Sequence, residues 1–259
     1  MGSSIGTANK DCVHDRLHLL DSLRGITLVS MILYHAAWDL VYIYGVKWNW
    51  YHGTGAYLWQ QSICWLFILL AGFCWSFGKK PFKRGLIVYG GGMLVSLVAL
   101  VVTPESRVIF GVLTMLGSCM LLMIPFEKCL KKVPAAVGFW ATALLFFLTR
   151  DINFGYLGFE GLHLCKLPDV LYANWFSTYL GFPMSGFYSM DYFSLFPWMF
   201  LFLSGYFGYR ICAEKNALQS RMFRLNCKPL SFIGRHSLLI YLLHQPVLYG
   251  VCFVINSLL

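Results

Sequence analysis

Charged residues are scarce in this sequence. Asp, Glu, Lys and Arg make up only 12% of its 259 residues, whereas 58% are hydrophobic. A soluble domain of this size carries roughly twice that charged fraction, about 25%. The scarcity of charge therefore argues against a water-soluble protein and favours one integral membrane domain in contact with lipid.

Paired cysteines and common catalytic motifs are also missing. The nine cysteines form no CxxC pair and no regular spacing, and most lie in apolar stretches, where a free cysteine behaves as a small hydrophobic residue. We therefore expect neither a disulfide framework nor a metal site. The sequence contains no GxGxxG, P-loop, HExxH or GxSxG motif. We interpret the run Gly90–Gly92 as small residues that let helices approach closely.

The N-terminal segment has no hydrophobic core of the kind found in a cleavable signal peptide. We interpret residues 1–19 as a polar cytoplasmic tail and residues 20–259 as one integral membrane domain. The net charge of +9 could indicate a nucleic acid partner, but the basic residues fall between apolar segments instead of gathering on one face. We therefore expect no nucleic acid partner.

Seven apolar stretches divide the chain, each close to the ~20 residues that a transmembrane helix needs. They predict an all-α fold, a polytopic transmembrane bundle of about seven helices. The stretches span residues 25–46, 57–78, 86–103, 108–126, 134–149, 192–210 and 237–257.

The basic residues alternate between the connections. Sixteen of the 20 Lys and Arg residues lie before or at Arg24 and within 79–84, 127–132 and 210–235, whereas the alternate connections hold only four. Because basic connections stay in the cytoplasm, this asymmetry predicts a cytoplasmic N-terminus. The long connection 150–191, rich in aromatic residues, then lies outside as a functional lid or as an interfacial cap.

The first apolar stretch contains a histidine and a carboxylate, His35 and Asp39, spaced i and i+4 on one helical face. Counted from Arg24 at ~1.5 Å per residue, His35 lies roughly 16 Å along the helix, near the middle of a ~30 Å hydrocarbon core. Ionisable residues at that depth usually carry function, and Asp39 could orient the imidazole as a base. The alternative is a packing histidine with Asp39 near the outer interface. Arg24 either marks the cytoplasmic helix end or meets a phosphate group.

Two further histidines are candidates. The last stretch places Ser237, Tyr241, His244 and Gln245 on one polar stripe, which could serve chemistry or join neighbouring helices by hydrogen bonds. His52 lies in the segment WNWYHGTGAY between the first two stretches. On the outer side it could meet a substrate, or it could be an interfacial residue among aromatic side chains.

Four blocks of the sequence resemble the catalytic-domain family of the heparan-alpha-glucosaminide N-acetyltransferases, within the wider membrane acyltransferases whose first helix reads LRG…H. The blocks are LDSLRGITLVSMILYHAAWDL (20–40), FGVLTMLGSCMLL (110–122), MDYFSLFPWMFLFLSGYFGY (190–209) and IGRHSLLIYLLHQPVL (233–248). Bacterial relatives often read FGILH in the second block, whereas this chain has Thr114 in place of the histidine.

The resemblance implies an acyl-CoA-dependent acyltransferase-like domain in residues 20–259, in a bacterial plasma membrane. It would move an acetyl group from cytosolic acetyl-CoA, its co-substrate, to an amine or hydroxyl of an extracytoplasmic sugar or glycan. The catalytic position is His35 by comparison with the wider group and His52 by comparison with the lysosomal enzyme. Asp39 and His244 would assist, and the candidates for binding substrate or acyl-CoA are Arg24, Asp191, Trp198, Arg235, Ser237 and Tyr241.

Two chemical routes and one rival function stay open at this level. The histidine could act as a general base or as a covalent acyl carrier, with Tyr241 and His244 stabilising the oxyanion. The rival is a proton-coupled transporter that uses the same histidines as a relay. Against it, the sequence shows no inverted repeat and no paired broken helices.

Overall fold

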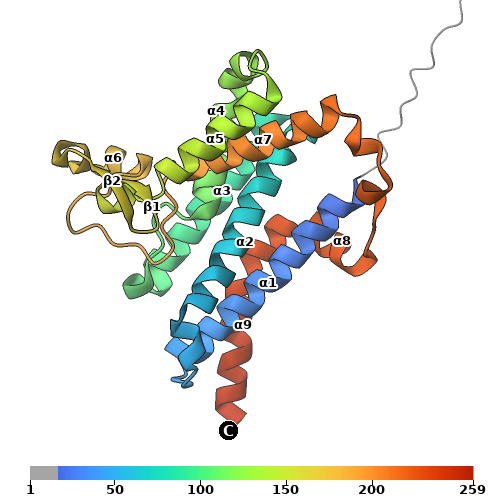
Figure 1. Cartoon of the computed structure of the whole chain (residues 1–259). Coiled ribbons are helices and arrows are strands. Elements are labelled where there is room, and N and C mark those ends of the chain that lie inside the picture. Colours follow the sequence, from blue (N-terminus) through green and yellow to red (C-terminus); the bar gives the residue numbers. More distant parts are fainter. Residues whose placement is uncertain (1–16, 259) are drawn as a thin grey trace, which may run out of the picture.

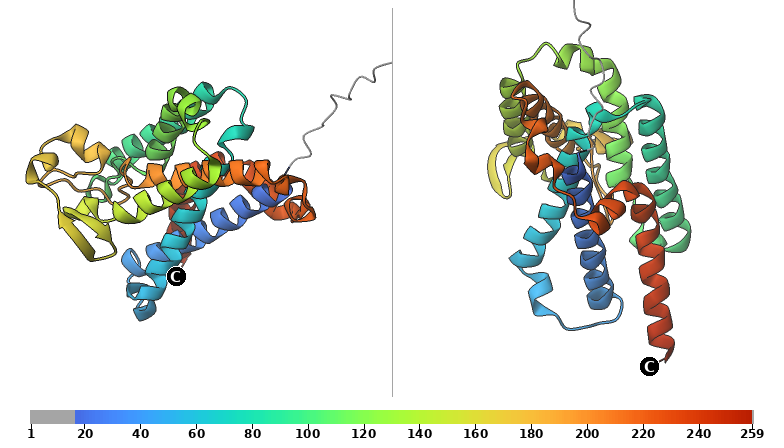
Figure 2. Two further views of the ribbon diagram at one scale, coloured as in Figure 1. Left: turned by 45° about the horizontal axis from the view of Figure 1, so that its top comes forward. Right: turned by 90° about the vertical axis from the view of Figure 1, so that its right-hand side faces the viewer.

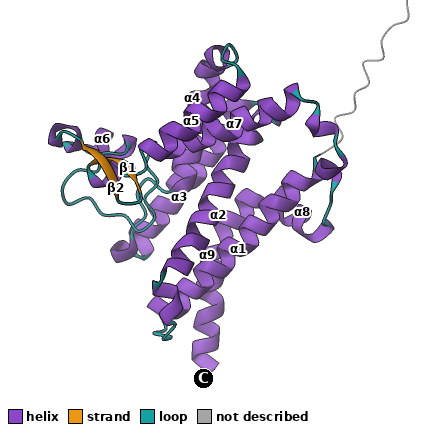
Figure 3. Cartoon of the chain, in the orientation of Figure 1, coloured by secondary structure: helices purple, strands orange, loops and turns teal. Residues whose placement is uncertain are grey.

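The structure, a computed structural model, describes residues 17–258 and is mainly helical (Figures 1 and 3). Within this range nine α-helices follow one another, joined by short turns and by one β-hairpin. The helices are α1 (His18–Tyr42), α2 (Thr54–Phe73), α3 (Pro81–Val102), α4 (Val112–Leu130), α5 (Ala135–Leu148), α6 (Trp175–Leu180), α7 (Trp198–Glu214), α8 (Lys228–Arg235) and α9 (Ser237–Leu258). The strands are β1 (Tyr156–Phe159) and β2 (Leu162–Lys166).

Each of the seven predicted apolar stretches contains one long helix, namely α1 to α5, α7 and α9. Four of them are long and apolar enough to cross a membrane: His18–Tyr42, Thr54–Phe77, Pro81–Val102 and Val112–Leu130. These four confirm the prediction of a helical membrane protein. That α5, α7 and α9 also cross, and that the N-terminus is cytoplasmic, stay predictions.

The first helix begins earlier than the sequence predicted, at His18 and not near Gly25. The predicted tail of residues 1–19 therefore ends in two helical residues, and the rest of it, residues 1–16, lies outside the described residues. The added turns pack against α8, where Gly25 faces the backbone of Leu230 and Gly234 faces the carbonyl of Asp21. His35 then lies seven residues, or ~10 Å, before the C-terminal end of α1 at Tyr42. His35 is thus closer to this end of its helix than the sequence predicted, since the sequence placed it near the middle of the span.

The core lies where α7 packs between α2 and α5, and α7 is buried along most of its first three turns. Its fully buried side chains Phe202, Tyr206 and Phe207 meet Ile68 of α2 and Met115 of α4 in one apolar cluster. Because lipid tails are as apolar as these side chains, close packing must hold such helices together.

Glycines allow three helix pairs to touch along their backbones. A Cβ on Gly205 of α7 would lie 2.2 Å from the Leu69 carbonyl oxygen, and one on Gly72 of α2 would lie 1.9 Å from that of Phe202. The α1–α8 contact described above is of the same kind. Between α3 and α4, a Cβ on Gly92 would lie 2.4 Å from a backbone nitrogen. The packing role predicted for the Gly90–Gly92 run is therefore confirmed at Gly92.

The connection between α5 and α7 departs from the all-α prediction. It contains the antiparallel hairpin β1–β2 and the short helix α6, and it forms a cap at one side of the helices (Figure 1 and Figure 2, left). The buried carboxylate of Asp151 fixes the hairpin turn by accepting the backbone N–H groups of Glu160 and Gly161, at 3.0 and 2.8 Å. Because polar hydrogen bonds hold the hairpin, the pattern of apolar stretches in the sequence did not predict it.

Candidate functional site

The structure brings together two of the histidines that the sequence singled out. The rings of His35 on α1 and His244 on α9 lie 4.9 Å apart between centroids and are tilted by 54°. Both side chains are partly buried. The Nδ1 atom of His244 is hydrogen-bonded to the carbonyl oxygen of Tyr241, whereas its buried Nε2 atom has no partner within the described residues. The free ring nitrogen makes His244 able to exchange a proton with a neighbour.

Asp39 has a different partner from the one predicted. Its carboxylate is fully buried and accepts the Nε2 donor of Gln245 at 3.0 and 3.4 Å. No hydrogen bond between Asp39 and His35 is found in residues 17–258. The Oε1 atom of Gln245 is buried without a partner there. Asp39 and Gln245 thus join α1 to α9 beside the histidines, and they fix the helix register that brings the two rings together.

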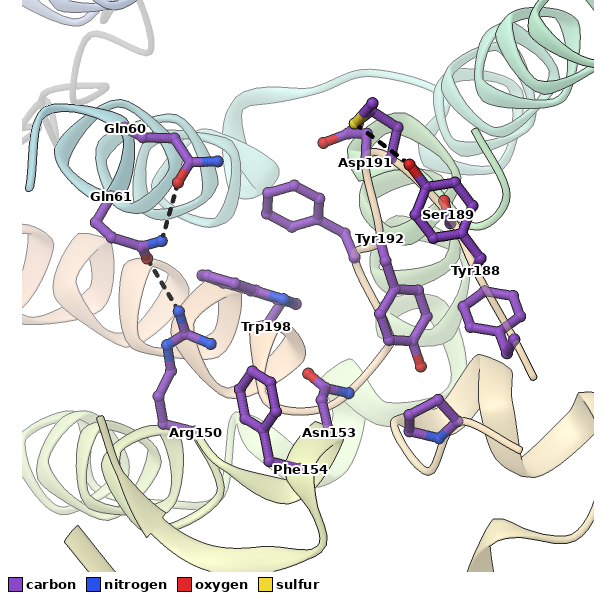
Figure 4. Close-up of a pocket in the computed structure, with 14 residues that line it drawn as sticks. Gln60, Gln61, Arg150, Asn153, Phe154, Tyr188, Ser189, Asp191, Tyr192 and Trp198 are labelled. Atoms are coloured by element: carbon purple, nitrogen blue, oxygen red, sulfur yellow. Dashed lines mark hydrogen bonds between the residues drawn. The ribbon is translucent and has the colours of Figure 1, made fainter. Parts of the chain in front are cut away.

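A cavity of about 340 Å³ lies on the cap side of the helices (Figure 4). One wall comes from α2 and the start of the cap, and the opposite wall comes from the connection that precedes α7. Figure 4 shows Arg150 on the first wall and Asp191 on the second. The lining mixes aromatic rings with amide and hydroxyl groups from Gln60, Gln61, Asn153, Phe154, Phe187, Tyr188, Ser189, Tyr192 and Trp198.

Arg150 organises the first wall. Its guanidinium forms an ion pair with Glu160 at 3.1 Å, donates to Gln61 Oε1 at 3.2 Å and lies 5.0 Å from the ring centre of Trp198. Trp198 is almost completely buried, so it supports Arg150 from behind. The pairing with Glu160 also ties the hairpin of the cap to α2.

Asp191 is the ionisable group of the second wall. The N–H of Val112 at the start of α4 donates a hydrogen bond to it, and burial raises the pKa of its carboxyl to about 6. A second, smaller gap of about 10 Å³ lies behind it and is lined by both Asp191 and Tyr241. Tyr241 is in ring contact with His244 at 5.3 Å. Asp191 therefore borders both the cavity of about 340 Å³ and the small gap beside Tyr241, whose ring contacts His244.

Basic side chains mark the opposite end of the helices. Arg24 of α1 and Arg84 of α3 lie close enough for their charges to interact, and the buried NH1 atom of Arg84 has no hydrogen-bond partner among residues 17–258. Arg235 reaches Asp21 at 3.8 Å. Ser237 begins α9 and is partly buried. Arg24, Arg235 and Ser237 are thus separated along the helices from the histidines.

His52 is not part of the histidine pair. It is exposed at the end of a short helical turn, Asn49–His52, and its Nδ1 atom is 3.3 Å from the Tyr42 hydroxyl. It therefore lies at the C-terminal end of α1, about two turns beyond His35.

A comparison with known families identifies the chain. The family model described as "Heparan-alpha-glucosaminide N-acetyltransferase, catalytic" matches residues 16–246. The chain belongs to this family. Searches among curated proteins and among solved structures gave no match.

Membership of the N-acetyltransferase family gives the chain an acetyltransferase-type function in a membrane protein. The matched range includes both paired histidines, the residues that line the cavity, and Arg24 and Arg84 at the other end of the helices. In residues 17–258 no three His, Cys, Asp or Glu side chains come together in a group that could hold a metal ion.

Two arginines of the candidate site were not predicted from the sequence: Arg84, which lies near Arg24, and Arg150, which lines the cavity. Arg84 lies in the cluster KKPFKR, where nothing in the sequence sets it apart from its basic neighbours. Arg150 stands beside Asp151 at the end of the apolar stretch 134–149, and a pair of opposite charges at this position is the one signal that could have pointed to it.

Proposed function

We propose that this protein transfers an acetyl group from cytosolic acetyl-CoA to an amine or hydroxyl of a sugar or glycan on the outer side of a bacterial plasma membrane. The observation that carries the proposal is the His35–His244 pair, whose rings are 4.9 Å apart. It lies between basic side chains at one end of the helices and a polar cavity at the other. Family membership supports acetyl transfer, and the arrangement supports transfer between two compartments.

The inner arginines suit the donor. The guanidinium groups of Arg24 and Arg84 repel each other unless an anion lies between them, and Arg84 NH1 is a donor that no residue in 17–258 satisfies. Phosphate groups, such as those of CoA, satisfy guanidinium donors in fork geometry. The pantetheine arm would then extend along α1 toward the histidines.

The outer cavity suits the acceptor. A volume of about 340 Å³ is within the range of small-molecule sites. Sugars present apolar ring faces to aromatic side chains and hydroxyl groups to amides, and this cavity offers Tyr188 and Tyr192 beside Gln60 and Asn153. Asp191 and Trp198, which the sequence proposed as substrate contacts, both line it.

Chemistry at the histidines needs a base and a proton donor. In the reaction, the acceptor nitrogen or oxygen forms a bond to the acetyl carbon and the carbon–sulfur bond of acetyl-CoA breaks. One imidazole takes the proton from the acceptor and returns it to the CoA sulfur. In this proposal His244 assists His35 in these transfers through its unpartnered Nε2 atom, and Tyr241 contacts His244 through its ring. Asp39 acts through Gln245 and α9, which hold His244 beside His35.

The test measures acetyl transfer and CoA release by the purified protein in lipid nanodiscs with radiolabelled acetyl-CoA. His35→Gln cannot accept the proton at neutral pH and should lower turnover about 10²–10⁴-fold. His236→Gln, a substitution at an exposed histidine outside the His35–His244 pair, is the matched control and should keep full turnover. Solute flux without CoA release would support the transporter alternative and contradict the proposal. Full activity of His35→Gln with an inactive His52→Ala would move the chemistry to His52.

Native cysteines allow a direct test of sidedness. Cys165 on β2 and Cys129 near the end of α4 are both free and exposed. The basic asymmetry predicts that a membrane-impermeant maleimide added to intact cells labels Cys165 and reaches Cys129 only after the cells are lysed. Cys165→Ser and Cys129→Ser identify each labelled site. Labelling of Cys129 and not Cys165 in intact cells would show that the chain has the opposite orientation. The proposed sides for the acetyl-CoA donor and the acceptor would then be contradicted.

A further inference from the structure

A line of ionisable side chains leads from the outer cavity to the paired histidines. Asp191 lines the cavity and also lines the small gap behind it, which it shares with Tyr241. The Tyr241 hydroxyl is close enough to Asp191 for an electrostatic interaction, and the Tyr241 ring contacts His244. The gap of about 10 Å³ is at the lower end of the volume that one water molecule needs. Asp191 is therefore the first ionisable group that an acceptor meets on this path.

The surroundings of Asp191 leave its carboxylate available. In residues 17–258 no Lys, Arg or His nitrogen lies within 4 Å of it, and its hydrogen bond from Val112 uses one of its two oxygens at most. The groups that face it are the Tyr241 hydroxyl from α9, the Cys64 thiol from α2 and the amino end of α4. Arg150 lies across the cavity and is paired with Glu160. A carboxylate without a cation partner is able to receive one from a ligand.

Proton balance shows what such a group is needed for. An acceptor amine enters from neutral solution mainly as an ammonium ion, R–NH₃⁺, and must lose two protons to become an amide. The histidine pair handles one of them, because the proton that the imidazole takes from nitrogen ends on the CoA sulfur. The other proton has to leave before the nitrogen can attack, since an ammonium nitrogen has no free electron pair.

We propose that Asp191 binds the ammonium form of the acceptor in the outer cavity and removes this first proton. The nitrogen–hydrogen bond breaks and the proton joins a carboxylate oxygen of Asp191, which leaves a neutral amine with a free electron pair for acetyl transfer. The protonated carboxyl then releases its proton to the outer solution through the open side of the cavity. This inference rests on the proposed function and assigns the two deprotonations to two separate groups.

The ionisation of Asp191 agrees with this role. Burial raises the pKa of its carboxyl to about 6, so the group is ionised at pH 7 and can still take up a proton transiently from a bound cation. The general expectation is that efficient bases have pKa values near the working pH. An ordinary exposed aspartate would be a weaker base.

The test is the pH profile of Asp191→Asn with glucosamine as the acceptor. Asn keeps a side-chain oxygen for the Val112 N–H, so the start of α4 stays capped. Without the carboxylate the variant can use only the neutral amine already present in solution, and that fraction rises about tenfold per pH unit below the pKa of the amine. We expect kcat/KM to be about tenfold below wild type at pH 6.5, with a deficit that disappears as the pH rises through the pKa of the amine. Asp169→Asn, at an exposed cap carboxylate, is the control and should follow wild type.

The outcomes separate the inference from the proposed function. A deficit that stays constant with pH would assign Asp191 a structural role and overturn the inference alone, as would a variant equal to wild type throughout. An inactive wild-type protein would overturn the proposed function and the inference with it. Recovery of Asp191→Asn at high pH, together with a pH-independent loss in His35→Gln, supports both.

Discussion

The partly buried carboxyl of Asp191 makes a quantitative prediction about stability. Its pKa is about 6 in the folded protein, whereas the ordinary value for an aspartate, which applies to the unfolded chain, is 3.8. Between these two pH values the folded state holds more protons than the unfolded state, so the free energy of unfolding falls as the pH rises through this window. A difference of about two pKa units corresponds to ~3 kcal/mol at most.

Asp191→Asn removes this dependence because the amide has no charge to bury. The variant should equal wild type near pH 4, where the carboxyl is protonated, and should exceed it by up to ~3 kcal/mol at pH 7 and above. At roughly 2–4 °C per kcal/mol for a chain of this size, the melting temperature should rise by up to about 6–12 °C. The other carboxyl groups titrate equally in both proteins, so the difference between the two isolates Asp191.

The assay is the thermal unfolding of both proteins in one detergent, followed by fluorescence-detected size exclusion at pH 4, 5, 6, 7 and 8. Equal melting temperatures at pH 8 would refute the reasoning, because they would mean that the charge of Asp191 is compensated in the fold. A lower stability of Asp191→Asn would show that the hydrogen bond from the Val112 N–H to the charged carboxylate stabilises the fold by more than the burial of that charge costs. Combined with the loss of turnover expected above, a stabilised variant would exemplify a functional group held at a cost in stability.

Two further predictions concern the helix contacts. Gln245→Leu leaves the fully buried Asp39 carboxylate without its hydrogen-bond donor, and we expect the free energy of unfolding to fall by roughly 2–5 kcal/mol. Adding Asp39→Leu to the same chain should restore most of this stability, which a double-mutant cycle of melting temperatures measures. An additive double mutant would contradict a direct pair. Gly205→Val places atoms where the Leu69 carbonyl lies 2.2 Å from a Cβ, so it should separate α2 from α7 and cost about 1–3 kcal/mol or prevent folding. Gly250→Val, with open space around it, should express and unfold like wild type.

The helix positions could be predicted because hydrophobic length is a local property of the sequence. All seven predicted stretches contain a helix, and the largest error is at the start of α1. That error has a tertiary cause, since residues 18–24 are too polar to be recognised as membrane-spanning and are helical where they pack against α8. The β-hairpin was missed because it is held by the side chain of Asp151 and not by a run of alternating apolar residues.

The candidate site could be predicted only in part. His35 and His244 were both singled out as polar residues in apolar helices, yet nothing in the sequence indicates that residues 209 positions apart share one contact. The neighbour relation between Asp39 and His35 suggested a hydrogen bond, whereas the structure gives Asp39 a partner on another helix. Which polar residue meets which is decided by helix packing, and no local pattern records it.

The helix that carries His244 is fastened differently from its neighbours. Three helix pairs meet backbone to backbone at glycines and tolerate no added side chain there. Toward α9, by contrast, a Cβ on Gly91 of α3 would lie 3.6 and 3.7 Å from Leu242 and Leu238, which is an ordinary side-chain contact. The side of α9 that faces α3 is therefore able to accept side chains of other sizes, whereas the Asp39–Gln245 hydrogen bond holds the side that faces α1. Substitutions at these leucines change one contact of α9 and leave the glycine contacts of the other helix pairs intact.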